Sequence, residues 1–222
     1  EHRGPRPCCG RGLAVIDLDA ATVLLQWATG GLFFLWVTGR RREVGIGYGW
    51  TMRITFGLMT AAAVAVGVLF EPQPVRDTFG ALMLVATAVA LGVSAVRRKA
   101  GVAGQRGNEE RRSARVAAMT GIDKDAQNFS DGPEFPAHLD LLAPLLGVVA
   151  LVAGGIHAGH PAWLSVARVL IGALFLGAIS DAMLLGHWYL VQPGLARGPL
   201  IELVWWSGLL WPFELAVLLW PT

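Results

Sequence analysis

Six apolar stretches alternate with polar segments along the whole chain. They cover residues 20–38, 54–70, 79–96, 141–156, 162–191 and 200–220. An α-helix of about 20 apolar residues crosses the hydrocarbon core of a bilayer, and most of these stretches approach or exceed that length. Their apolar residues are continuous and do not alternate with a period of two, which favours helices over the strands of a barrel. The pattern therefore predicts an all-α, polytopic transmembrane helix bundle of about six spans.

Residues at the ends of the stretches sharpen some of these boundaries. Asp19 precedes the first stretch and is a suitable N-cap. Tyr48, Trp50 and Arg53 precede the second, where aromatic rings favour the lipid–water boundary and an arginine can extend toward water. Pro212 lies inside the last stretch and is expected to kink that helix, because proline removes a backbone hydrogen bond and clashes with the preceding turn.

The spacing of the stretches divides the chain into four segments. We expect an extracytoplasmic N-terminal lead over 1–19, three spans over 20–96, a polar and basic connector over 97–138 and three further spans over 139–222. The connector is expected to be solvated, with docking of a partner or of anionic lipid as the alternative. No sequence repeat relates the two halves, although three spans each would permit an inverted repeat.

Composition supports a chain that is surrounded by lipid. Hydrophobic residues make up 54% and charged residues 15%, whereas a soluble domain typically carries about 25% charged residues. The formal net charge of +2 is too small to suggest binding to nucleic acid. The 28 glycines indicate close helix packing, because small residues let helix backbones approach each other in lipid.

The basic residues predict an orientation in the membrane. Most of the 18 Lys and Arg residues fall in three loops that would lie on one side: Arg40, Arg41, Arg42, Arg97, Arg98, Lys99, Arg106, Arg111, Arg112, Arg115, Lys124 and Arg197. The opposite side would hold only Arg3, Arg6, Arg11 and Arg76. By the positive-inside rule the basic loops face the cytoplasm. We therefore expect a multi-pass protein of the cell (inner or plasma) membrane with both termini outside.

The first residues of the chain contain no clear functional signal. Residues 1–13 show no charged region followed by an apolar region and a cleavage site, so no ordinary signal peptide is expected. The adjacent Cys8 and Cys9 are unsuited to bridging each other. They are expected to be exposed thiols, with a lipidated or metal-binding pair as the alternative.

Polar and ionisable residues interrupt the fifth stretch. Asp181 is the deepest of them, and an ionisable residue at such a depth normally faces the bundle interior and finds a partner. Ser180 and His187 share another face of the same helix. We expect His187 to contact Glu202 across the hairpin that joins the last two helices, because both lie close to its turn. That contact is either a structural clamp or a proton or ligand site.

A second polar group is expected deeper between the same two helices. By depth, Asp181 is expected to face Ser207 and Gly208, and Glu214 lies further toward the outer side. Pro212 leaves one carbonyl without its helical donor. Together these groups would line a polar cavity suited to proton relay, unless Glu214 is satisfied by Arg168 or by surface water.

The remaining histidines offer weak metal or haem candidates. His157 and His160 would share a helix face and bind a metal only if the fourth helix continued through them, whereas Gly159 and Pro161 indicate that it ends. No two histidines lie at matching depth on different helices, so the chain by itself predicts no bis-histidine haem site, and a haem shared with another subunit stays open. The cofactor is therefore unknown.

Tryptophans concentrate near the C-terminal end. Trp188, Trp205, Trp206 and Trp211 lie too deep for an interfacial belt. They are expected to fill the bundle or face lipid, or alternatively to pack against a partner subunit, a quinone or a pigment.

These features leave three hypotheses, and the chain contains none of the common catalytic motifs. The favoured hypothesis is a non-catalytic subunit or binding component of a membrane complex, with a redox or quinone link. The alternative is a small transporter or proton-coupled carrier that uses Asp181 and Glu214. The third is a membrane enzyme with a His187–Glu202 site.

Overall fold

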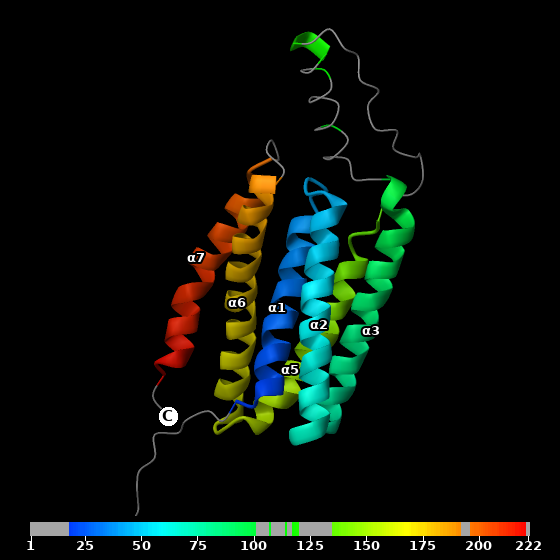
Figure 1. Cartoon of the computed structure of the whole chain (residues 1–222). Helices are drawn as coiled ribbons and strands as arrows, with labels where there is room; N and C mark the ends of the chain where they lie inside the picture. The colour runs from blue at the N-terminus through cyan, green and yellow to red at the C-terminus, as the bar shows by residue number, and fades with distance from the viewer. Residues whose placement is uncertain are drawn as a thin grey trace, which may run out of the picture.

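The computed structural model describes residues 18–100, 135–191 and 196–220, together with positions 107, 114 and 117–119. In these parts the chain is helical and contains no strand (Figure 1). The long helices are α1 (Ala20–Gly39), α2 (Ile46–Phe70), α3 (Pro74–Val96), α5 (Leu139–His157), α6 (Ala162–Val191) and α7 (Gly198–Leu218), and a short 3₁₀ turn, η1 (Arg97–Ala100), follows α3. All six long helices are apolar and long enough to cross a membrane, which confirms the predicted polytopic helical bundle.

The helix starts show where the apolar pattern was informative. Asp19 caps α1 as predicted, and its carboxylate accepts a hydrogen bond from the Thr22 amide at 2.6 Å. By contrast, α2 begins at Ile46 and α3 at Pro74, each several residues before its apolar stretch. Proline is well suited to a first helical turn, where no amide partner is required. Glycines, Thr51 and Arg53 interrupt the apolar pattern in the first two turns of α2, and Arg76 and Asp77 interrupt it in the first turn of α3, which hid the true starts of both helices.

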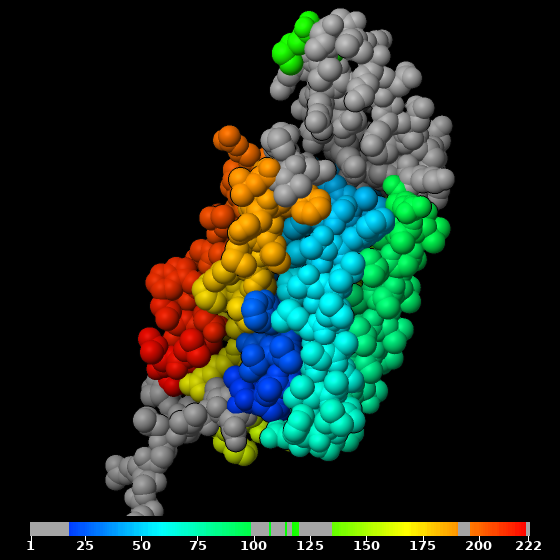
Figure 2. All heavy atoms as spheres, viewed as in Figure 1, coloured from blue at the N-terminus to red at the C-terminus, as the bar shows by residue number. Residues whose placement is uncertain are grey.

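Helix α1 occupies the centre of the bundle. It packs against α2, α5 and α6, and 61% of its span is buried, compared with 11% for α7. Figure 2 shows α1 reaching this face of the molecule only as a strip between α2 and α6. Helix α7 lies at the edge and packs mainly on α6 (Figure 1). The two predicted halves are therefore interleaved, because the first helix packs against two helices of the second half.

Glycines bring α1 and α6 into backbone contact. A Cβ placed on Gly30 would lie 1.8 Å from the Ala173 carbonyl oxygen, and one on Gly177 would lie 2.2 Å from the Gly30 carbonyl carbon. No side chain fits at either position without moving a backbone. Next to this crossing, Gly31 accommodates the ring of Phe56 from α2. The small residues thus allow three helices to converge on the middle of α1.

The two ends of the bundle differ in composition. The end of α1 and the start of α2, the end of α3 and the start of α5, and the end of α6 and the start of α7 all lie at one end of the bundle (Figure 1). We call this the basic end, because these three connections contain the arginine clusters noted above. The α2–α3 and α5–α6 turns lie at the other, here the opposite end. Most of the connector predicted over 97–138 falls outside the described residues.

A buried arginine closes the opposite end. Arg76 was assigned to a loop from the sequence, but it lies in the first turn of α3 with only 1% of its surface exposed. It pairs with Asp19, and it donates to Asp77 at 2.9 Å and to the Glu71 carbonyl at 2.8 Å. Four partners, including Thr22 at 3.3 Å, make its burial tolerable. This arginine therefore ties the starts of α1 and α3 together.

Candidate functional site

Asp181 is the most unusual polar residue in the described part of the molecule. It lies on α6 with none of its surface exposed, and neither carboxylate oxygen has a hydrogen-bond partner among the described residues. Ala178 and Leu185 are equally buried and share its helix face. With a rise of 1.5 Å per residue, Asp181 lies about 15 Å along α6 from the basic end. The carboxyl is thus well inside the bundle and faces its core, not lipid.

Tyr48 is a buried polar residue near Asp181 that the sequence did not indicate as its neighbour. It lies in the first turn of α2, and its buried phenol oxygen has no hydrogen-bond partner among the described residues. The phenol lies within electrostatic range of the Asp181 carboxyl. Its ring packs edge-to-face against Trp188 of α6, with 6.1 Å between ring centroids. We had assigned Tyr48 to the membrane interface, but it points inward.

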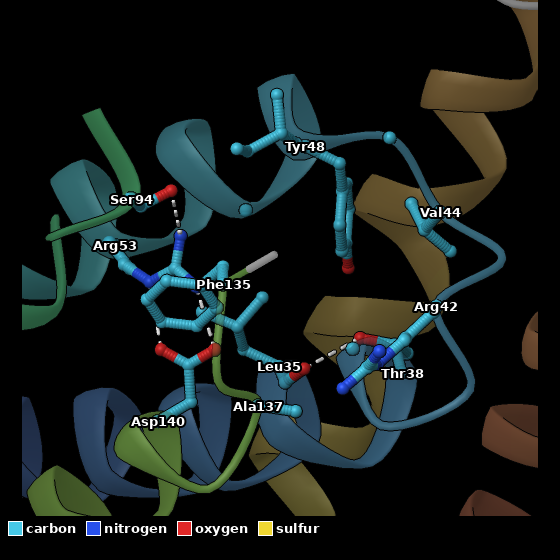
Figure 3. A pocket seen from close by; sticks show the side chains of 14 residues that line it. Leu35, Thr38, Arg42, Val44, Tyr48, Arg53, Ser94, Phe135, Ala137 and Asp140 are labelled. Carbon is cyan, nitrogen blue, oxygen red and sulfur yellow. Dashed lines mark hydrogen bonds and ion pairs between the residues drawn. The ribbon is translucent and has the colours of Figure 1, made fainter. Parts of the chain in front are cut away.

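Tyr48 also lines a cavity of about 50 Å³ at the basic end. Figure 3 shows Tyr48 hanging from α2 with its hydroxyl directed away from Arg53. Residues from α1, α2, α5 and the end of α3 form the walls, including Thr38, Arg42, Ser94, Phe135 and Asp140. The Thr38 hydroxyl donates to carbonyls of its own helix, and it also lies close enough to the Tyr48 phenol to interact with it.

A buried ion pair forms the far wall of this cavity (Figure 3). Arg53 donates to both carboxylate oxygens of Asp140, at 2.8 and 2.6 Å, and both side chains are only 5% exposed. The guanidinium also donates to Ser94 at 3.4 Å, and the Phe135 ring lies over it at 4.5 Å. The predicted extension of Arg53 toward water is therefore wrong. Bidentate pairing holds it inside, between α2 and α5.

Asp140 explains why the sequence missed this pair. It lies in the first turn of α5, immediately before the apolar stretch predicted over 141–156, so it was not counted among the polar residues inside a span. An acidic residue in a first turn interacts favourably with the helix dipole. That position also brings its carboxylate level with Arg53, near the start of α2.

The predicted contact between Asp181 and Ser207 is wrong. The Ser207 hydroxyl donates instead to the Leu203 carbonyl of its own helix at 2.9 Å. Ser180 is also occupied: it accepts from the Trp27 indole at 2.7 Å and donates to the Leu176 carbonyl at 2.7 Å. Asp181 is fully buried in the bundle and has no hydrogen-bond partner on α7 among the described residues.

The predicted contact between His187 and Glu202 is also wrong. Glu202 pairs with Arg40 and Arg41 at the end of α1. His187 donates through Nδ1 to the Met183 carbonyl at 2.8 Å. It borders a shallow groove of about 190 Å³ between α2 and α6, together with Tyr48, Thr51, Met52, Leu184 and Trp188. The two side chains lie on different faces of the hairpin, and no hydrogen bond or ion pair joins them in the described structure.

Glu214 lies apart from Asp181, near the opposite end. Its Oε1 approaches Gly172 of α6, beside the Gln26 side chain of α1, and its Oε2 is buried without a partner among the described residues. Arg168 does not satisfy it, because Arg168 donates to the carbonyls of Val217 and Trp220 at the end of α7. Glu214 and Asp181 therefore do not form the single polar cavity that we predicted.

The histidines at the opposite end do not share a helix. α5 ends at His157, whose Nδ1 donates to the Ala153 carbonyl at 2.8 Å, and His160 lies in the following turn. Across the described residues, no group of three or more His, Cys, Asp or Glu side chains is arranged to hold a metal ion. Cys8 and Cys9 lie outside the described residues.

The four deep tryptophans point in different directions. Trp188 packs on Tyr48, and Trp206 packs edge-to-face on Phe34 of α1 at 6.0 Å. Trp205 and Trp211 are exposed on the outer face of α7. They do not assemble into one planar binding site among the described residues.

Comparison with known proteins identifies no relative. No protein-family model, no curated protein and no solved structure matches the chain. The functional argument therefore rests on Asp181, Tyr48 and the cavity at the basic end.

Proposed function

We propose that this integral membrane protein binds and releases a proton at Asp181 and acts as a small proton-coupled carrier. The observation that carries the proposal is a carboxyl that is fully buried in the bundle, with neither oxygen hydrogen-bonded to a described residue. Most buried polar side-chain atoms in proteins have a partner, and an ionisable residue inside a membrane bundle is typical of ion and proton pathways.

A purely structural role does not account for this carboxyl. Polar groups that clamp membrane helices do so through hydrogen bonds or ion pairs, as Arg53 does with Asp140. Asp181 makes neither kind of contact with the described residues. Burial without a partner costs free energy, which is a reason to seek a function for the residue.

A proton suits the site better than a metal cation. Hard cations take about six or more oxygen ligands. The Tyr48 phenol lies within electrostatic range of Asp181, and no group of three or more metal-ligating side chains is found in the described part of the chain. One carboxyl with one phenol can share a proton but cannot surround a metal ion.

We also propose that the basic end faces the cytoplasm. The positive-inside rule supports this orientation, because the three loops at that end contain most of the arginines. Asp181 would then be closer to the cytoplasmic surface than to the outer one. Proton release toward the cytoplasm would be the shorter path.

Proton flux into liposomes tests the carrier. Purified protein is reconstituted with a trapped pH-sensitive dye, and a potassium diffusion potential drives protons inward. We expect the wild type to acidify the lumen and Asp181→Asn to fall to the rate of protein-free liposomes. Glu71→Gln, which changes an exposed carboxyl at the opposite end, should keep the wild-type rate. Equal rates for Asp181→Asn and wild type, or no flux through the wild type, would refute the proposal.

A second candidate function is a subunit of a larger membrane complex, with another membrane protein covering α7. The observation that favours it is the small buried share of that helix, 11% of its span, with Trp205, Trp211 and Phe213 exposed on it. Aromatic side chains are typical of interface hot spots. A photo-crosslinker at Trp205 should capture one stoichiometric membrane subunit in native membranes, and crosslinks to lipid alone would contradict this role. A redox or quinone link stays a prediction.

A further inference from the structure

We propose that Tyr48 is a proton relay between the cavity at the basic end and Asp181. This inference rests on the proposed function, because it takes the Asp181 carboxyl as the group that receives the proton. It adds the route and the residue that would govern the rate of proton access. Three observations support it: the position of the phenol, the polar groups among the cavity walls and the pairing of the acidic side chain that lines the cavity.

The phenol connects the two places that the proton must link. Tyr48 lines the basic-end cavity, and its hydroxyl lies within electrostatic range of Asp181. Both groups are buried and lack hydrogen-bond partners among the described residues. In Figure 3 the Tyr48 hydroxyl is directed away from the Arg53–Asp140 pair. The side chain thus lines the cavity and at the same time packs against α6 through Trp188.

The cavity is suitable for water. A water molecule needs roughly 10–15 Å³ of accessible space and two to four polar partners, and this cavity measures about 50 Å³. Its walls supply the hydroxyls of Thr38 and Ser94, the carboxylate of Asp140 and the guanidinium of Arg53. A short chain of waters in this space would bring protons as far as the phenol.

Among the residues that line the cavity, Asp140 is the one acidic side chain, and it is already occupied. The Asp140 carboxylate is held by two hydrogen bonds from Arg53, which favour its ionised form over a protonated one. α1 carries no titratable side chain between Ala20 and Gly39. On α7, Glu202 is paired with arginines and Glu214 lies near the opposite end. His157 of α5 is also at the opposite end, whereas Tyr48 lies within electrostatic range of Asp181.

The transfer requires only proton exchange. A water in the cavity that carries an excess proton gives it to the Tyr48 oxygen and becomes neutral water, while the phenol proton passes to the Asp181 carboxylate. One O–H bond forms and one breaks at the phenol, which stays neutral, and the net result is one proton moved from water to Asp181. Rotation of the phenol hydroxyl then restores its starting geometry. No oxidant, reductant or metal takes part.

His187 offers an alternative route that the same experiment can test. It borders the groove between α2 and α6 on which Tyr48 also lies. Its Nδ1 is occupied by the Met183 carbonyl, and its ring is exposed on the outer face of the bundle. A proton that reached Asp181 through this groove would depend on His187 and not on the cavity at the basic end.

Hydrogen–deuterium exchange at the Asp181 carboxyl tests the relay directly. Infrared difference spectra between wild type and Asp181→Asn in nanodiscs isolate the carbonyl stretch of this carboxyl, and a pH titration establishes where it is protonated. The rate at which the band shifts after transfer to D₂O is then measured in Tyr48→Phe and His187→Ala. Tyr189→Phe is the matched control, because it changes the other tyrosine of the chain, whose hydroxyl donates to the Ala196 carbonyl near the α6–α7 loop.

We expect Tyr48→Phe to keep the carboxyl band but to slow its exchange by about tenfold or more, as general acid–base groups contribute about 10²–10⁴-fold to proton transfer. Tyr189→Phe and His187→Ala should exchange at the wild-type rate. Unchanged exchange in Tyr48→Phe would overturn the relay, as would slow exchange confined to His187→Ala. A third outcome separates the two proposals. If Tyr48→Phe keeps the carboxyl band and slows its exchange, but the wild type gives no proton flux in liposomes, the carrier proposal is refuted and the relay proposal is supported.

Discussion

At the scale of single residues, the molecule contains two kinds of buried aspartate. Asp140 is held by Arg53 through two hydrogen bonds, whereas Asp181 has no such contact among the described residues. Burial is nearly complete in both cases. The same substitution at these two positions should therefore change stability in opposite directions, and this difference separates a structural carboxyl from a functional one.

Replacement of Asp181 by leucine should not weaken the fold. The change removes a buried carboxyl that is not hydrogen-bonded to the described residues and fills the space with an apolar side chain of similar size. We expect the free energy of unfolding to stay the same or to rise by about 1–3 kcal/mol, with proton flux lost. Denaturant titration in detergent micelles, followed by circular dichroism, measures the change. A marked loss of stability would mean that Asp181 holds the bundle together.

Replacement of Asp140 by leucine should destabilise the protein strongly. It leaves the Arg53 guanidinium buried without its counter-charge, and breaking one side of a buried pair costs about 3–5 kcal/mol. The same titration measures this loss. The double variant Arg53→Met with Asp140→Leu is the control, because it removes both charges and should recover most of the stability. If the double variant is no more stable than Asp140→Leu alone, the broken ion pair is not the cause of the destabilisation.

At this scale the sequence predicted which residues are unusual but not their partners. Asp181, Glu214 and His187 stood out because ionisable groups are rare in apolar stretches. Their neighbours depend on how each helix is rotated about its axis, and a uniformly apolar helix gives little information on that rotation. Depth alone suggested Ser207 for Asp181 and Glu202 for His187, and both assignments failed. Tyr48 was missed because a tyrosine near a span end resembles an interfacial anchor.

At the scale of helices, the bundle depends on how closely α1 approaches α6. The two backbones meet where Gly30 faces Ala173 and Gly177, so the packing tolerates no side chain there. The sequence predicted all six spans because membrane thickness fixes their length. It also indicated close packing from the number of glycines. It did not show which glycines lie at the crossing, since open positions such as Gly92 and Gly208 look the same in the sequence.

A valine at Gly177 should disrupt this crossing. Its Cβ would lie within 2.2 Å of the Gly30 backbone, so α6 must move away from α1. We expect the free energy of unfolding to fall by about 1–3 kcal/mol, which is the loss typical of overpacked cores. Gly92→Val on α3, where an added Cβ meets nothing within 4 Å, should change stability by no more than about 0.5 kcal/mol. Thermal unfolding of both variants in the same detergent compares their stabilities. Equal losses of stability in the two variants would show that the α1–α6 crossing does not determine the stability of the bundle.

At the scale of the whole molecule, the bundle has two chemically distinct ends. The basic end contains the arginine-rich connections, the Arg53–Asp140 pair and the cavity, and the opposite end is closed by Arg76 and its partners. Because the number of spans is even, the start of α1 and the end of α7 lie at the same end of the bundle, which is the opposite end defined above (Figure 1). The fold fixes this parity, whereas the choice of which end faces the cytoplasm depends on charge.

Cysteine labelling in intact cells should establish the orientation. The lead that precedes α1 contains the only two cysteines of the chain, Cys8 and Cys9, so a maleimide that cannot cross membranes should label the wild type from outside if the basic end faces the cytoplasm. In a variant with both replaced by serine, a single cysteine at Ser113, within the basic connector, should react only after the cells are made permeable. The positive-inside rule makes this the expected pattern, because moving so many arginines outward during insertion is unfavourable. The reverse pattern, with Ser113→Cys labelled in intact cells, would invert the topology and place Asp181 nearer the outer surface.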